Sequence, residues 1–258
     1  MKAWMVGFTC VFTKAFAMYV GNPASCEFPK EGLFSSEEDR VAIKVAYQTE
    51  VVLDRKMENT VTHSRVENAG LRFEQGVVFV NFLDRLEIIA SLGTLQIGLS
   101  KDIVPGAKLS LDTHANFSWS IGGQSELILW GNTSLGVVAN YLASSMTPET
   151  LFLNHKPIAE DSTKLSYNTW QVALALSQKV DPFSVYIGGV YSYATLQMQS
   201  GVFQNFLGSG VQEETYRNRH ALSMVLGVSL AAHKAYTLNV ETQAFGQIAI
   251  GMNMCLRF

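Results

Sequence analysis

Apolar and polar side chains alternate along most of the chain, and this period of two is typical of β-strands whose two faces meet different surroundings. The final segment, residues 247–258, alternates without interruption. One face carries Ile248, Ile250, Met252, Met254, Leu256 and Phe258, and the other carries Gln247, Ala249, Gly251, Asn253, Cys255 and Arg257. This pattern predicts a closing strand with one apolar face and one more polar face.

Nine earlier segments show the same alternation, less regularly in places. They lie near residues 41–53, 70–82, 86–97, 117–129, 134–141, 170–179, 183–198, 222–230 and 236–241. With the closing strand they make about ten strands, and any even number between roughly eight and twelve fits the pattern. The chain is therefore expected to be all-β.

The connections between these strands alternate between short and long. Short connections lie near residues 83–85, 131–132, 181–182 and 232–235, and long ones near 55–69, 100–115, 144–163 and 200–218. Outer-membrane barrels have short periplasmic turns, long external loops and an even strand count. A soluble β-sandwich, the main alternative, has no reason to keep its long loops at one end. The pattern favours a single antiparallel transmembrane β-barrel with both chain ends in the periplasm.

The composition agrees with a barrel in lipid. Apolar residues make up 48% of the chain and charged residues only 16%, whereas soluble domains carry about 25% charged residues. Past the N-terminus no apolar run reaches the roughly 20 residues that a membrane helix needs. Six outward aromatic residues could form the girdles at the two membrane interfaces. They are Trp119, Trp170, Tyr47, Tyr141, Tyr191 and Tyr193.

The N-terminus divides into two predicted parts ahead of the barrel at residues 40–258. Residues 1–17 are expected to be a secretory signal, with Lys2 before a short apolar region and Ala15-Phe16-Ala17 as a small-x-small cleavage site. Residues 18–39 are polar, contain two prolines and are expected to be an exposed extension. Outside the signal the cysteines are Cys26 and Cys255, which could pair, cross-link to partners or stay reduced.

Side chains on the inner faces of the strands are the candidate functional surface, because rings of charged groups set the ion preference of a pore. The expected lumen-lining residues are Lys44, Gln48, Glu50, Glu126, Gln171, Lys179, Asn253 and Arg257. Barrels of eight strands are filled by side chains, and about 16 strands leave an aqueous channel. Whether a lumen of about ten strands conducts, or is plugged by its own ion pairs, stays open.

We expect no catalytic residues, no metal site and no cofactor. The five histidines are scattered over loops, and there is no GxSxG, HExxH or phosphate-binding loop. Two cysteines give no metal-ligand spacing. With a net charge of −3 and no basic stripe, nucleic-acid binding is not expected either. The chain is therefore not predicted to be an enzyme.

Six blocks that keep their order along the chain are Gly21–Ala24, Asn116–Gly122, Leu129-Trp130, Tyr167–Leu176, Pro182–Gly189 and Leu256–Phe258. These blocks resemble the chlamydial major outer membrane protein family of porins. The resemblance implies a porin in a chlamydia-like outer membrane. The chain is shorter than the family and nearly free of cysteine, which puts the family's disulfide cross-linking in doubt, although Cys26 could make one intermolecular bond.

Two functions follow from these expectations. The first is a porin-like protein through which small hydrophilic solutes or ions diffuse passively. The second is a non-conducting outer-membrane barrel whose external loops serve adhesion or envelope structure. The expected partners are membrane lipid, the small solutes and the barrel assembly machinery, which reads a terminal aromatic residue such as Phe258 in bacterial barrels; an oligomer of identical copies stays open.

Overall fold

The fold was obtained as a computed structural model. It describes residues 20–22, 40–104, 107–154, 156–158, 163–199, 213–233 and 236–258. Within these ranges no helix is long and apolar enough to cross a membrane. The predicted signal and the rest of the predicted N-terminal extension lie outside the described residues, as does Cys26.

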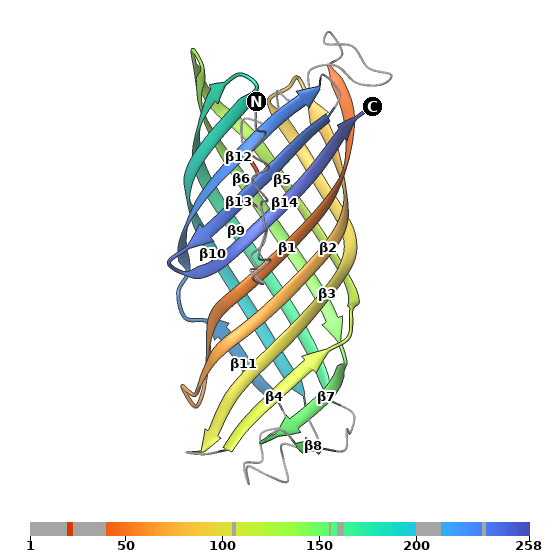
Figure 1. The fold of residues 1–258 in the computed structure, drawn as a ribbon, viewed down its shortest axis with the longest axis vertical. Coiled ribbons are helices and arrows are strands. Elements are labelled where there is room, and N and C mark those ends of the chain that lie inside the picture. Colours follow the sequence, from red (N-terminus) through yellow and green to blue (C-terminus); the bar gives the residue numbers. More distant parts are fainter. Residues whose placement is uncertain are drawn as a thin grey trace, which may run out of the picture.

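Ten long antiparallel strands close into a barrel (Figure 1). In order they are β1 (Val41–Asn59), β2 (Arg65–Phe82), β3 (Leu86–Val104), β5 (Asn116–Trp130), β6 (Thr133–Met146), β9 (Lys164–Val180), β10 (Phe183–Gln199), β12 (Leu222–His233), β13 (Tyr236–Ala244) and β14 (Gln247–Arg257). Each strand pairs with the next one in this order, and β14 pairs with β1 from Lys44↔Arg257 to Arg55↔Gln247. The prediction of a closed antiparallel barrel of about ten strands is confirmed.

Four shorter strands lengthen the wall at the end away from the C-terminus (Figure 1). They are β4 (Ala107–Thr113), β7 (Pro148–Leu153), β8 (Lys156–Ile158) and β11 (Glu213–Asn218). β4 pairs with β3 and β7, β7 pairs with β8, and β11 bridges β10 and β1. We call this the extended end, and we call the opposite end, with its tight turns, the short-turn end.

The long loops expected near residues 55–69, 100–115 and 144–163 are therefore mostly strand in the described residues. Between β1 and β2, only residues 60–64 form a turn. The expected loop near residues 200–218 lies outside the described residues up to β11. The expectation of loops is wrong at the first three places because the wall itself continues there, with the polarity of its two faces exchanged.

A band of outward apolar side chains runs around the barrel between two aromatic belts. The first belt crosses β5, β6, β9 and β10. The ring centroids of Trp119 and Tyr141 lie 5.7 Å apart, and that of Trp170 lies 5.3 Å from that of Tyr191 and 6.1 Å from that of Tyr193. Other exposed aromatic residues lie near the short-turn end: Trp130, Phe183, Tyr236 and Phe258. Ten residues at roughly 3.3 Å each, tilted by roughly 40°, give a band about 25 Å high, which matches the lipid-facing band of outer-membrane barrels.

Beyond the first aromatic belt the outer face of the wall changes from apolar to polar. On β9, the outward residues on the lipid side of Trp170 are Val172 and Leu174. Those on the side of the extended end are Asn168 and Ser166. On β2, the outward residues beyond the belt include the exposed ion pair of Arg72 and Glu74. Polar outward side chains suit water and not lipid, so the wall leaves the membrane at this belt. We call the part of the wall beyond it the cap.

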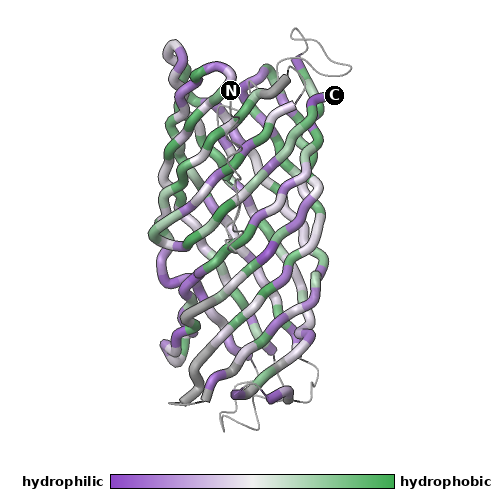
Figure 2. The backbone as a smooth tube through the Cα atoms, in the orientation of Figure 1, coloured by the Kyte–Doolittle hydropathy of each residue, from purple (hydrophilic) through white to green (hydrophobic). Residues whose placement is uncertain are grey.

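The inner face changes in the opposite sense at the same level. On β9, inward Gln171 and Thr169 are followed towards the extended end by Tyr167 and Leu165. On the other cap strands, apolar inward residues meet in one buried cluster with these two. The cluster consists of Val52, Met57, Val66, Ala69, Leu71, Phe73, Leu95, Ile97, Leu99, Leu111, Leu142, Met146, Leu165, Tyr167, Ala194, Leu196, Met198, Tyr216 and Ala249. The cap is thus built like a water-soluble barrel, polar outside and apolar inside. Figure 2 shows the alternation along the strands.

The three described residues of the predicted N-terminal extension lie inside the barrel. Val20 is 2% exposed and Asn22 is 0% exposed, and both contact side chains of the wall. The expectation of an exposed segment is therefore wrong for Val20–Asn22. The polar composition of the segment does not distinguish solvent from a polar lumen, so the sequence could not separate the two.

Candidate channel lumen

The inner wall of the lipid-facing band is mostly polar, and its side chains form networks across several strands. At the short-turn end, the Nζ of Lys44 on β1 lies 2.5 Å from Glu87 Oε1 on β3. The same carboxylate accepts hydrogen bonds from Asn81 Nδ2 (2.8 Å) and Gln124 Nε2 (2.5 Å). Buried charges need such partners, because an unpaired buried charge is strongly unfavourable. This network ties β1, β2, β3 and β5 together around the lumen.

Arg257, the last residue of β14, belongs to the same end of the lumen. Its side chain is buried, and its Nη1 lies 3.2 Å from Asp84 Oδ1 in the turn between β2 and β3. The next residue, Phe258, donates its backbone N–H to Ile43 O at 2.9 Å. The end of the chain is therefore tied to the first strands by charge and by the sheet ladder.

Halfway along the band, two asparagines face each other across β13 and β14. Asn239 Nδ2 donates to Asn253 Oδ1 at 3.4 Å. The other two amide atoms, Asn239 Oδ1 and Asn253 Nδ2, are buried and have no hydrogen-bond partner among the described residues. Buried amide atoms in folded proteins are nearly always satisfied by protein or water. This level of the lumen therefore calls for water.

Towards the cap, hydrogen bonds run in a chain from β1 to β13. The Nε of Arg55 donates to Gln247 Oε1 at 2.8 Å, and Arg55 also bonds to the hydroxyl of Tyr167. Gln247 Nε2 donates to Gln243 Oε1 at 2.7 Å, and Gln243 Nε2 lies 3.5 Å from Glu241 Oε1. The chain thus joins a buried arginine to a buried carboxylate across the lumen side of three strands.

Glu241 binds the N-terminal segment. Its Oε1 accepts the backbone N–H of Val20 at 2.7 Å, and its Oε2 accepts that of Gly21 at 2.9 Å and the hydroxyl of Tyr186 at 2.8 Å. Asn22 Nδ2 then donates to two serine hydroxyls of the wall. These are Ser184 Oγ at 3.2 Å and Ser229 Oγ at 3.0 Å.

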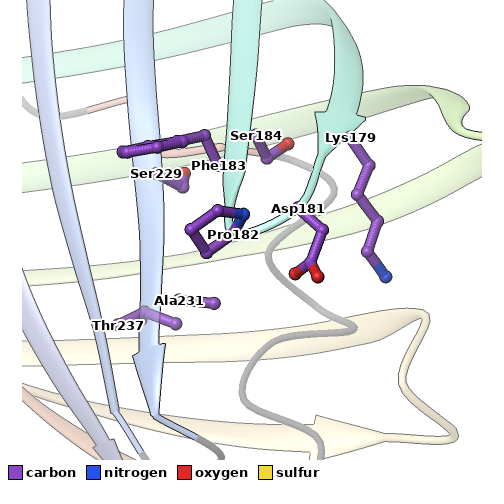
Figure 3. A pocket seen from close by; sticks show the side chains of 8 residues that line it. All are labelled: Lys179, Asp181, Pro182, Phe183, Ser184, Ser229, Ala231 and Thr237. Atoms are coloured by element: carbon purple, nitrogen blue, oxygen red, sulfur yellow. The ribbon is translucent and has the colours of Figure 1, made fainter.

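A small pocket lies at the short-turn end, beside the turn between β9 and β10 (Figure 3). The two serines that bind Asn22 form part of its wall. Its lining residues are Lys179, Asp181, Pro182, Phe183, Ser184, Ser229, Ala231 and Thr237. Lys179 lies here at the rim and is only half-buried. It therefore faces the mouth of the barrel and not the middle of the lumen.

The other expected lumen-lining residues all lie on the inner face and are buried. They are Lys44, Gln48, Glu50, Glu126, Gln171, Asn253 and Arg257. The barrel closure brings two pairs of them side by side on β1 and β14, Lys44↔Arg257 and Gln48↔Asn253. Gln48 Nε2 also lies 3.4 Å from Glu50 Oε2. Glu126 and Gln171 lie on β5 and β9, away from these pairs.

Three charged residues of the inner wall, Arg55, Glu87 and Glu241, were not among the expected ones. The register of β1 shifts between Val52 and Asp54, so Arg55 points inward where a strict period of two would point it outward. Glu87 and Glu241 keep the alternation of β3 and β13 and face inward. A buried charge within an alternating strand is the signal that could have marked Glu87 and Glu241.

Cys255 also faces the lumen. It is a free thiol, buried beside Ala46, Val77, Phe79 and Ile89. Burial on the inner face keeps Cys255 from a neighbouring molecule in the membrane, so an intermolecular cross-link through it is excluded in this conformation. In the part of the chain that the structure describes, no group of three or more His, Cys, Asp or Glu side chains could hold a metal ion.

The chain is similar to known outer-membrane proteins at low sequence identity. No protein-family model matches the chain. Among curated proteins, the major outer membrane porin, serovar L1, of Chlamydia trachomatis is 21% identical over 289 residues, covering 78% of this chain and 74% of the porin. This identity does not establish membership of that family.

Solved structures that are similar to the chain share the barrel fold at low identity. An outer membrane channel from Pseudomonas putida F1 is 12% identical, with 88% of this chain and 98% of the channel covered and a TM-score of 0.43. OprG from Pseudomonas aeruginosa is 10% identical, with 84% and 96% covered and a TM-score of 0.38. The protease OmpT from Escherichia coli is 10% identical, with 84% and 93% covered and a TM-score of 0.37. The closed barrel and its lipid-facing band make this chain an outer-membrane β-barrel.

Proposed function

We propose that the barrel is a narrow porin-like channel through which small hydrophilic solutes and ions cross the outer membrane. The observation that carries this proposal is the polar inner wall of the lipid-facing band, where buried amide atoms of Asn239 and Asn253 require water. The porin from Chlamydia trachomatis supports the same class of function.

The charges of the lumen favour small solutes of either sign. The buried charged residues of the described inner wall are Lys44, Arg55 and Arg257, and Glu50, Glu87, Glu126 and Glu241. Cations and carboxylates are nearly balanced, and the pair of Lys44 and Glu87 neutralises itself. Because charged rings set ion preference, we propose at most a weak preference for cations.

The apolar core of the cap lies on this route. Leu95 and Leu196 lie in it, buried to 0% and 1% exposure. Apolar constrictions gate pores by excluding water until they widen. We therefore propose a channel that is closed in this conformation and opens when the cap core loosens.

Liposome swelling tests the proposal. Folded protein in vesicles should admit small sugars and exclude large ones, and Leu196→Ala should raise the swelling rate because it removes bulk from the constriction. Thr195→Ala, at the neighbouring position on the outer face, is the matched control and should leave the rate at the wild-type level. A rate equal to that of empty vesicles for all sugars, with both variants folded, would contradict the proposal.

A non-conducting barrel with a surface role is the second candidate, and the packed core of the cap favours it. The cap projects β7 and β8 beyond the membrane, where they could bind a partner. Replacing residues 148–158 by a short turn should then abolish binding of the barrel to that partner. If this variant still binds the partner and the wild type makes vesicles swell, this candidate is excluded.

A further inference from the structure

The residues around Val20–Asn22 form a binding site inside the lumen that is built from five consecutive strands. The side chain of Val20 packs in a buried apolar cluster with residues of β6, β9, β10 and β12, and its backbone is bound from β13. The cluster partners are Val138, Ala173, Ala175, Tyr186, Val190 and Val225. The wall therefore contacts Val20–Asn22 through both apolar packing and hydrogen bonds.

A hydrogen bond from Tyr186, whose ring packs over Gly227, orients the carboxylate of Glu241 towards this segment. A Cβ added at Gly227 would lie 2.1 Å from Tyr186 Cζ, so the tyrosine ring lies directly over the glycine. Because β12 offers no side chain at this position, the ring reaches across it and its hydroxyl bonds to Glu241 on β13. The wall thus fixes the orientation of the carboxylate, and both of its oxygens accept from the segment.

The backbone conformation of the segment allows it to make these hydrogen bonds. Gly21 has a positive φ of 79°, a conformation that is strained for residues with a side chain. In this conformation the consecutive N–H groups of Val20 and Gly21 both bond to Glu241, and Asn22 reaches the serines of β10 and β12. A carboxylate that accepts two backbone N–H groups recognises the peptide main chain and not a particular side chain.

We propose that Val20–Asn22 is an internal strap, bound to the wall by Glu241, that closes the lumen while it is in place; the closing role rests on the proposed channel function. Glu241 is buried, so its carboxylate needs hydrogen-bond donors from the protein or from water. When the strap leaves, water has to replace the N–H groups of Val20 and Gly21 at the carboxylate. The strap therefore acts as a gate on the membrane side of the cap.

Hydrogen–deuterium exchange of the folded full chain in lipid vesicles tests the binding. The amides of Val20 and Gly21 should exchange slowly in the wild type. Glu241→Gln should accelerate them at least about tenfold, because the side-chain amide cannot accept both N–H groups and the charge that strengthens them is gone. Val240→Ala, on the lipid face of the same strand, is the matched control and should exchange like the wild type. Slow exchange that Glu241→Gln leaves unchanged overturns the strap.

Planar-bilayer recordings of the same proteins test the closing role. Glu241→Gln should raise the open probability several-fold over the wild type, and Val240→Ala should not. A wild type that is permanently open while Val20 and Gly21 exchange slowly overturns the closing role. If exchange accelerates in Glu241→Gln but neither protein ever conducts, the bound strap is supported, and the channel function and the closing role with it are overturned.

Discussion

At the residue scale, the fit between Gly227 and Tyr186 shows how strongly one side chain depends on the absence of another. The tyrosine ring occupies the volume that any Cβ at residue 227 would need. A Cβ added at Gly189, on the neighbouring strand β10, would meet no atom within 4 Å. Only Gly227 is therefore needed to make room for another side chain, although both glycines lie within strands.

We predict that Gly227→Ala destabilises the folded barrel by about 1–3 kcal/mol, the usual range for overpacking a buried site. The tyrosine ring has to move, and its hydrogen bond to Glu241 is lost with it. Urea unfolding in lipid vesicles measures the change. Gly189→Ala is the control and should alter stability by less than about 0.5 kcal/mol. Equal effects of the two substitutions would show that the ring does not lie over Gly227.

The ion pair of Lys44 and Glu87 gives a second prediction at this scale. Lys44→Met should destabilise the barrel by about 3–5 kcal/mol, because it leaves the carboxylate of Glu87 buried without its cation. The double variant Lys44→Met/Glu87→Met should recover much of this loss, since buried pairs add little net stability over apolar side chains. The same unfolding assay measures both. A single variant as stable as the double one would mean that Glu87 is hydrated rather than paired.

At the scale of elements, β9 is an example of a strand that consists of two parts in series with opposite polarity. Between the aromatic belts β9 presents Val172 and Leu174 to lipid, and beyond Trp170 it presents Asn168 and Ser166 to water. The outer face also becomes polar beyond the belt on β6 and β10, the two strands beside β9. The sequences of these strands therefore mark where the wall leaves the membrane.

This boundary predicts a strong dependence on depth. Leu174→Arg, in the middle of the band, should destabilise the barrel by about 2–4 kcal/mol, whereas Ser166→Arg, eight residues away on the same face, should change stability by less than about 1 kcal/mol. Equilibrium folding into vesicles measures both. Similar losses at the two positions would show that the membrane extends over the cap.

The same exchange of polarity explains what the sequence could and could not predict. Alternation found the strands and their outer faces between the belts, because lipid outside and a polar lumen inside make a clear pattern. Beyond the first belt the apolar face turns inward, so the regular pattern breaks and buried strand residues such as Val66 and Leu111 were expected in loops. Arg55 was missed because a register shift precedes it, and Glu241 because its strand is short of apolar residues.

At the scale of the whole molecule, the barrel combines a polar middle with the two closures that we propose. The strap at Val20–Asn22 lies within the band, and the apolar core of the cap lies outside it. Neither closure could be predicted from the sequence, because both depend on contacts between residues far apart in the chain, such as Val20 with Glu241. The fold was predictable from local patterns, whereas the state of the lumen was not.

The single-channel conductance of the purified, folded wild-type chain in planar bilayers tests the proposed channel most directly. Folding is established beforehand by a compact gel band that shifts on heating. We predict infrequent, discrete current steps of one small size, because a narrow polar lumen opens only when both closures yield. Bilayers that stay silent after insertion of folded protein, at every voltage applied, would contradict the channel function.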